Sequence, residues 1–338
     1  MRQAARRISL TVIALAIAAL TLWASLALWF RLPAPELARA FAALLFGIVG
    51  LATVIAVFSR YRRAALLIYV AAFTVLLFWW STIKPMAKAD WSPDVAVQVT
   101  GTQSGDLLTL NGVRDFAWRG ENEFAENWTT RTYDLTRLRT LDLFMSYWAG
   151  PEMAHVIMSF GFEGGDYLAW SIEVRRRVGG KFSPVADLFK NSPLVIIAAD
   201  ERDVVGVRSN IRHEDVQLYR LNVSPAAARA LLLEYVADAN ALAAKPQFYN
   251  SITTNCTTTI WKMIRAVGDA APFDWRLIVN GYLPDYAYSR GALASGLSLQ
   301  ALRAAAHIDA RAQAAGLSSP DFSELIRVDV PSPFGSTP

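Results

Sequence analysis

Cysteine and charged residues are scarce in this 338-residue sequence. A single cysteine excludes a disulfide-stapled scaffold. Charged residues make up 18% of the chain and apolar residues 54%, whereas a typical soluble domain has about 25% charged residues. Intrinsic disorder needs low hydrophobicity and high charge, the opposite of this composition, and is therefore excluded. The net charge is only +4 and the basic residues form no stripe, so we expect no nucleic-acid partner. Part of the chain must instead lie outside water.

The apolar excess is concentrated at the N-terminus, in three runs over residues 8–30, 40–58 and 64–83. A helix of about 20 apolar residues crosses the hydrocarbon core of a bilayer. A cleaved signal peptide is the alternative for the first run, with Ala38-Arg39-Ala40 imitating a cleavage site. The apolar core of a signal peptide is only about 7–15 residues long, and here a second run follows at once. We therefore expect a three-helix transmembrane anchor over residues 1–84.

Basic residues predict the orientation of this anchor. They precede the first run and fill the turn between the second and third: Arg2, Arg6, Arg7, Arg60, Arg62 and Arg63. The positive-inside rule then places the N-terminus and this turn in the cytoplasm. Residues 85–338 should lie outside, and the compartment that fits best is the periplasm of a bacterium, beyond a multi-pass inner-membrane anchor. An unpaired cysteine in an oxidising compartment is a candidate reactive thiol.

The part after the anchor has the mixed pattern of an α+β domain, without internal repeats. Apolar and β-branched runs predict strands over 107–116 (with a turn at Asn111-Gly112), 154–162, 167–178, 194–198 and 216–221. Residues 135–148 fit a strand or a helix. Helices are predicted from Pro225 to about Leu242, with Ser224 as N-cap, from Asn255 to just before Gly268, and from about 297 to 315.

Residues 154–162 and 167–178 flank Glu163-Gly164-Gly165-Asp166, which predicts a β-hairpin. If the loop has an odd number of residues centred on Gly164, His155 and Glu173 share one face of the two strands. An even Gly-Gly loop would place Val174 there instead, because a slip of one residue exchanges the faces.

Cys256 lies in the first turn of the helix that begins near Asn255, where free N–H groups and the helix dipole lower a thiol pKa. A nucleophilic cysteine also needs a histidine as base. Of the three histidines, His213 lies in a charged turn and His307 in an alanine-rich helix, whereas His155 begins an apolar strand. We therefore predict a Cys256–His155 pair. The structural alternative is a small buried cysteine and a core histidine with satisfied hydrogen bonds.

Glu173 is the favoured residue to orient His155, and Ser171 is its rival. Arg175, Arg202 and Arg208 either bind a substrate phosphate or carboxylate or are ordinary solvated charges. There is no nucleophile elbow and no phosphate loop, and a zinc site built on His213, Glu214 and Asp215 lacks the usual ligand spacing. We expect neither a metal nor another cofactor.

Three blocks of sequence resemble a known family. They are Ala154-His155-Val156-Ile157-Met158-Ser159-Phe160-Gly161-Phe162 continuing to Ser171-Ile172-Glu173-Val174-Arg175, then Asp200-Glu201-Arg202-Asp203, then Phe248-Tyr249-Asn250 with Asn255-Cys256-Thr257-Thr258. Val113-Arg114-Asp115-Phe116 and Tyr133-Asp134-Leu135 fit as well. Over roughly residues 91–288 the chain resembles the Lnb N-terminal periplasmic domain family.

This family resembles circularly permuted, papain-like (NlpC-like) thiol enzymes, in which a histidine strand precedes an Asn-Cys at a helix start. The resemblance implies such a domain within residues 85–338, its core over about 91–288, followed by a C-terminal helix and tail. It also implies Cys256 as nucleophile, His155 as general base and then acid, and Glu173 as orienter. Residues expected to line the substrate site are Ser171, Arg175, Arg202, Arg208, Asn255 and Tyr249.

The implied activity is acyl transfer through a cysteine acyl-enzyme, to or from a lipoprotein or phospholipid, with membrane lipids as partners. Members named Lnb transfer an acyl chain to the N-terminal amine of bacterial lipoproteins, but carry their membrane helices after the periplasmic domain, whereas here three predicted spans precede it. A peptidoglycan amidase or endopeptidase uses the same chemistry. A membrane-tethered binding protein without activity would have an unreactive Cys256.

Overall fold

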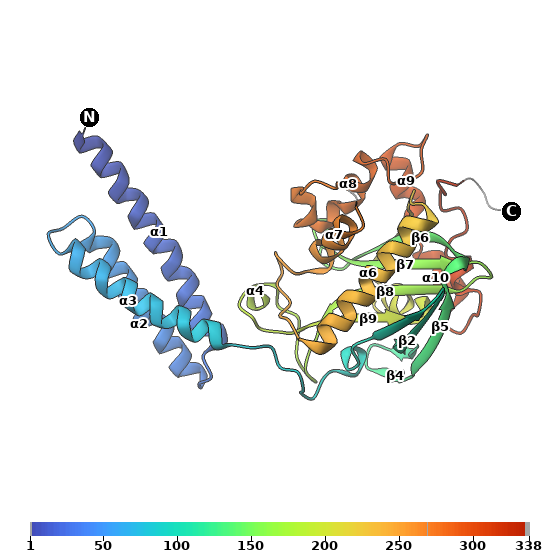
Figure 1. Ribbon diagram of the computed structural model, residues 1–338, viewed down its shortest axis with the longest axis horizontal. Coiled ribbons are helices and arrows are strands. Elements are labelled where there is room, and N and C mark those ends of the chain that lie inside the picture. The colour runs from blue at the N-terminus through green and yellow to red at the C-terminus, as the bar shows by residue number, and fades with distance from the viewer. Residues whose placement is uncertain (1, 269, 335–338) are drawn as a thin grey trace. The chain divides into compact units, whose positions relative to one another are not determined.

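The three apolar runs form long helices in the computed structural model, which describes residues 2–268 and 270–334. These helices are α1 (Arg2–Arg31), α2 (Glu36–Ala56) and α3 (Arg62–Thr82) (Figure 1). Each is long and apolar enough to cross a membrane, as predicted. Pro33 and Pro35 separate α1 from α2, since proline disfavours helix in the residue before it. The Thr21 hydroxyl of α1 lies 3.0 Å from the Tyr69 hydroxyl of α3.

The structure divides into two compact units, and one of them is not continuous in sequence. The first comprises the chain up to Met86 together with Ser183–Ser192, which contains the short helix α4 (Pro184–Asp187). Within this unit the Phe189 ring stacks on Phe30, with ring centroids 5.4 Å apart. The Lys190 ammonium donates to the Trp80 carbonyl at 2.7 Å. No local pattern in residues 183–192 predicts that this segment groups with the anchor helices.

The second unit is built on one mixed sheet with the strand order β1-β2-β9-β8-β7-β6-β10, and β5 pairs with β2. All neighbours are antiparallel except β2 and β9. A separate hairpin joins β3 (Ala117–Gly120) and β4 (Glu123–Ala125). The strands of the large sheet are β1 (Thr100–Ser104), β2 (Leu107–Arg114), β5 (Trp128–Asp134), β6 (Leu138–Tyr147), β7 (Ala154–Phe162), β8 (Tyr167–Val174), β9 (Leu194–Ala199) and β10 (Asp215–Arg220).

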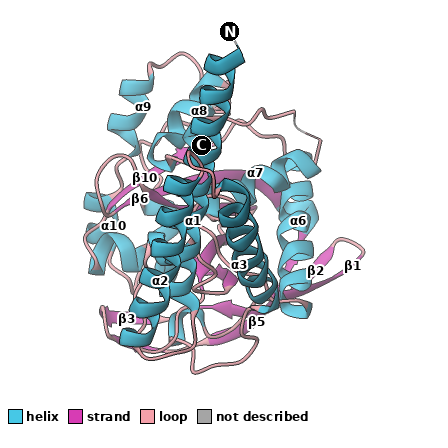
Figure 2. Ribbon diagram, turned by 90° about the vertical axis from the view of Figure 1, so that its left-hand side faces the viewer, coloured by secondary structure: helices cyan, strands magenta, loops and turns pink. Residues whose placement is uncertain are grey.

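Helices cover both faces of this sheet, so the unit is α+β, as predicted. One face packs against α6 (Pro225–Ala244) and α7 (Cys256–Ala266), with Trp170 and Phe160 fully buried beneath them. The other face packs against α5 (Glu201–Val204), α10 (Asp309–Ala315) and α11 (Phe322–Leu325). Figure 2 shows α6 and α10 on opposite sides of the sheet. The remaining helices are α8 (Leu283–Ser289), α9 (Leu299–Ala306), a π-helical turn (Val207–Ile211) and 3-10 turns at Pro93–Val95, Leu135–Arg137, Trp275–Leu277 and Asn280–Tyr282.

Three predicted elements are decided or corrected by the structure. Residues 138–147, within the stretch left open between strand and helix, form the strand β6. Asn111-Gly112 is a β-bulge within β2 rather than a turn, with Gly112 at a φ of +80°. The single helix predicted over 297–315 is wrong. The chain leaves helical geometry at His307, whose backbone bridges to Gln217 of β10, so α9 and α10 are separate.

Candidate active site

The β7–β8 hairpin determines which side chains share a face. Its register runs from Gly161 opposite Tyr167 to Ile157 opposite Ser171, so the loop is odd and centred on Gly164, as the first alternative predicted. Gly164 and Gly165 both adopt positive φ, at +96° and +88°, which glycine tolerates without strain. Continued by two residues, this register places His155 opposite Glu173.

Cys256 is the first residue of α7, directly after the N-cap Asn255. The Asn255 side-chain oxygen accepts from the Thr258 N–H at 2.8 Å, and the Asn255 N–H donates to the Thr258 hydroxyl at 3.0 Å. This reciprocal capping box fixes where the helix starts. Cys256 is 5% exposed, and the backbone N–H of Val156 on β7 helps to lower the pKa of its thiol. The helix start lies against the strand that carries His155.

His155 connects the thiol to a polar pair on β8. Its ring lies close enough to the Cys256 thiol to lower the pKa of that thiol, and its Nε2 lies 2.6 Å from the Ser171 Oγ and 3.1 Å from the Glu173 Oε1. The Ser171 hydroxyl in turn donates to the Glu173 Oε1 at 2.7 Å. With its hydrogen used in this way, Ser171 can only accept from Nε2–H, so Nε2 carries a proton. Nδ1 is then the ring nitrogen that can exchange a proton with the thiol.

Arg208, from the π-helical turn, completes the charge arrangement. Its Nη2 donates to the Glu173 Oε1 at 2.8 Å, and its side chain is buried. Burial alone would raise the pKa of Glu173, but the charges of His155 and Arg208 hold that pKa well below its usual value. Glu173 is therefore a carboxylate, held by one histidine and one arginine.

Burial and charge oppose each other at both members of the Cys256–His155 pair. Burial by itself lowers the pKa of His155, but the Glu173 carboxylate raises that pKa to about 9. Burial by itself raises the pKa of Cys256, but the hydrogen bond and charge of His155 bring that pKa below its ordinary value. Both shifts favour a thiolate next to an imidazolium.

Asn280 is a residue of this cluster that sequence analysis missed. Its amide accepts from the Ala154 N–H at 3.0 Å and donates to the Ala154 carbonyl at 2.7 Å. The same Nδ2 lies 3.1 Å from the Thr257 hydroxyl and 3.5 Å from the Cys256 Sγ. A buried asparagine thus joins the β7 backbone to the start of α7. The local sequence around Asn280 does not predict these contacts, because its partners are at least 23 residues away along the chain.

The other predicted site residues are only partly brought together. Arg208 and Ser171 contact Glu173, as described above. Arg175 instead donates to the carbonyls of Val95 and Ala96 and lies over the Trp91 ring.

Arg202 also lies away from the thiol, where it pairs with Asp200 and Asp115. Asn255 serves as helix cap, and Tyr249 is buried in the core with its ring 6.3 Å from that of Phe182. The structure therefore does not bring Arg175 or Arg202 to the Cys256 cluster.

A cavity of about 780 Å³ adjoins the cluster. Tyr147, which lines it, donates to the carbonyl of Gly281, the residue after Asn280. Glu214, also in the lining, accepts from the Ser146 hydroxyl, and Ser146 pairs with His155 across β6 and β7. Further lining residues are Glu121, Trp148, Gly150, Pro151, Arg212, His213, Asp215, Gln217, Tyr282 and Arg303. Cys256, His155 and Glu173 are not among the lining residues, so the cavity is linked to the cluster only through Tyr147, Glu214 and Gly281.

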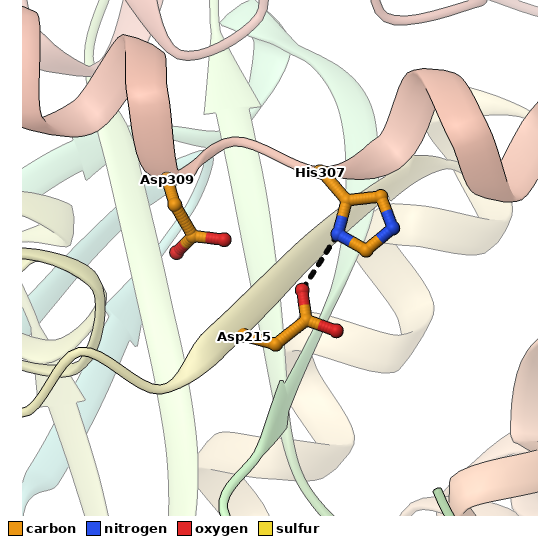
Figure 3. Close-up of side chains that lie close together, drawn as sticks. All are labelled: Asp215, His307 and Asp309. Atoms are coloured by element: carbon orange, nitrogen blue, oxygen red, sulfur yellow. Dashed lines mark hydrogen bonds and ion pairs between the residues drawn. The ribbon is translucent and has the colours of Figure 1, made fainter.

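Asp215, His307 and Asp309 gather on the exposed edge of β10, with one ligand atom of each within 4.8 Å of the others (Figure 3). They offer three possible metal ligands. This set differs from His213, Glu214 and Asp215, the residues considered from the sequence. Hydrogen bonds within the chain already account for their positions. The His307 Nδ1 lies 2.6 Å from Asp215, and the Asp309 carboxylate accepts the Val216 N–H.

Comparison with known proteins supports the family suggested by sequence. Residues 124–281, a little under half of the chain, match the family model of the Lnb N-terminal periplasmic domain. The matched range includes His155, Ser171, Glu173, Cys256 and Asn280. No curated protein and no solved structure matches the chain. The family match and the three apolar helices together describe a membrane-anchored protein with a periplasmic domain.

Proposed function

We propose that this protein is a membrane-anchored periplasmic thiol acyltransferase of the papain-like, NlpC-like group. The observation that carries the proposal is the continuous chain of contacts from Cys256 through His155 to Ser171 and Glu173. A helix-terminal thiol, a histidine on a neighbouring strand and a carboxylate behind that histidine are the parts that nucleophilic thiol catalysis needs.

In the proposed first half-reaction, the Cys256 thiolate attacks the carbonyl carbon of an acyl ester in the donor. The developing oxyanion would be stabilised by backbone N–H groups at the start of α7, including that of Cys256. When the C–O bond of the ester breaks, the leaving alkoxide takes the proton from Nδ1 of the His155 imidazolium. The products are an alcohol and a thioester on Cys256.

In the second half-reaction an acceptor amine attacks the thioester. Neutral His155 takes a proton from that amine through Nδ1, and the C–S bond breaks to return the thiolate. Glu173 keeps Nε2 protonated and supports the positive charge that the ring carries at the start and end of the cycle. The membrane anchor favours a lipid or lipoprotein as donor and acceptor, because it keeps the thiol close to acyl chains and headgroups.

Mass spectrometry of the intact protein purified from membranes tests this proposal. We expect a fraction of molecules to carry the mass of an acyl chain on Cys256, removable by hydroxylamine and absent from Cys256→Ser. Incubation with phospholipid vesicles carrying isotope-labelled acyl chains should transfer the label to Cys256. If the label never appears while muropeptides give a Cys256 adduct, the amidase or endopeptidase hypothesis replaces acyl transfer. If neither forms an adduct, the protein is not a thiol enzyme of this kind.

A further inference from the structure

The connection between β8 and β9 exposes apolar and basic side chains together. Val178 is 58% exposed and Phe182 is 36% exposed, and Arg177 and Lys181 are exposed between and beside them. We call Arg177, Val178, Lys181 and Phe182 the interfacial patch. Residues 175–182 contain no acidic residue. Exposed apolar side chains interleaved with basic ones are the composition of segments that lie in a membrane interface.

Neighbouring groups leave this patch with an excess of positive charge. The Arg176 guanidinium, next to the patch, pairs with Asp94, and Arg175 is occupied by backbone carbonyls. The backbone carbonyl of Asp90 accepts the Val178 N–H. Within the described part of the chain neither Arg177 nor Lys181 forms an ion pair, so the patch keeps two unpaired cations.

The chain that follows the patch belongs to the membrane anchor. Ser183, the residue after Phe182, begins the segment that groups with the three apolar helices. In that segment Phe189 stacks on Phe30, near the end of α1, and the Lys190 ammonium lies 4.6 Å from the centroid of the Trp80 ring, near the end of α3. Phe182 is bonded directly to Ser183, so the patch and the anchor segment are continuous in the chain.

We propose that the interfacial patch binds the surface of the bilayer. Val178 and Phe182 would enter the boundary between headgroups and acyl chains, and Arg177 and Lys181 would contact anionic phosphates. The partner is a bilayer containing anionic phospholipid, because the patch combines basic charge with apolar area and continues directly into the anchor. This surface is independent of the thiol chemistry proposed above.

Fluorescence quenching of the full-length protein in lipid nanodiscs tests the proposal. In a Cys256→Ser background, Val178→Cys would carry an environment-sensitive label, and Val328→Cys would carry the same label as a matched control. Val328 is also a valine and is 50% exposed. The nanodiscs would contain phosphatidylcholine with or without phosphatidylglycerol, plus a lipid with a nitroxide on its acyl chain. A second label at Phe182→Cys guards against a local effect of the first substitution.

We expect the nitroxide lipid to quench the labels at 178 and 182 severalfold more than the label at 328, and aqueous iodide to show the reverse order. Omitting phosphatidylglycerol or introducing Lys181→Glu should weaken the binding of the patch to the bilayer, by about fivefold for each electrostatic attraction between a basic side chain and the anionic surface that is lost. Equal quenching of all three labels by iodide would overturn the proposal. Protection of 178 and 182 from both quenchers would also overturn it, since the patch would then be covered by protein.

Discussion

At the scale of single residues, the surroundings of Cys256 act against the effect of burial on the pKa of its thiol. Cys256 is 5% exposed, and this burial by itself favours the neutral thiol. The His155 ring and the Val156 N–H reverse that preference and lower the thiol pKa. His155 can hold its positive charge in this buried position because the Glu173 carboxylate lies 3.1 Å from Nε2.

The first prediction concerns the rate at which iodoacetamide alkylates Cys256. The thiol pKa is lowered and that of His155 is raised to about 9, so the thiolate–imidazolium pair exists between the two pKa values. The alkylation rate should therefore already be high at neutral pH. After its first change at the thiol pKa, it should change a second time near pH 9, where the imidazolium loses its proton. His155→Ala should slow alkylation at pH 7 by about tenfold for each unit by which the thiol pKa rises. Unchanged labelling in His155→Ala would favour an inert buried cysteine.

The second prediction separates the roles of Glu173 and Ser171. Glu173→Gln removes the charge that raises the His155 pKa, so the alkaline step of the alkylation profile should move to lower pH by about one unit or more. Ser171→Ala removes a hydrogen bond but no charge and should move that step less. The reverse ranking would identify Ser171 as the main orienter. Thermal unfolding of both variants serves as control, because Glu173→Gln also removes the charged partner of the buried Arg208.

At the scale of elements, two helices with capped starts have different importance for the site. Asn255 caps α7, which carries Cys256, and Ser224 caps α6 by accepting from the Ala227 N–H at 3.2 Å. Both caps hold their helices in place, but only α7 starts at the thiol.

The third prediction compares these caps. Asn255→Ala and Ser224→Ala should each reduce the free energy of unfolding by about 1 kcal/mol, the usual cost of losing such a cap. Only Asn255→Ala should also slow alkylation of Cys256, because the first turn of α7 then loses its fixed position relative to Val156. Unfolding curves and alkylation rates of the two variants provide the measurement. Equal alkylation in both would mean that packing, and not the cap, positions the thiol.

At the scale of the whole molecule, the anchor orientation decides the compartment of the thiol. The arginines at 60, 62 and 63 lie in and beside the turn between α2 and α3, and those at 2, 6 and 7 lie at the start of α1. The positive-inside rule assigns both groups to the cytoplasm.

The fourth prediction is that a reporter active only in the periplasm will be active when fused after Pro338. The same reporter inserted at the Arg60–Arg63 turn should be silent, and a cytoplasmic reporter should give the opposite pattern at both positions. Activity at the turn and silence after Pro338 would invert the topology and place Cys256 in the cytoplasm.

The sequence by itself determined the elements whose signals are local. The three apolar runs were long enough to require helices, and the Glu163–Asp166 turn with its two glycines required a hairpin. The Asn255 cap before an apolar helical repeat predicted where α7 begins. Each of these depends on residues within a few positions of one another, so periodicity and capping rules can read them.

Only the tertiary structure decided which distant side chains meet. The odd loop at Gly164 selected the alternative that aligns His155 with Glu173. The thiol meets His155 across 101 residues of chain (256 − 155), and Asn280 reaches back 126 residues to Ala154. Residues 183–192, which connect β8 to β9, group with the anchor helices and not with the sheet. Contacts of this length depend on how whole faces of strands and helices pack together, and no local pattern in the sequence encodes that packing.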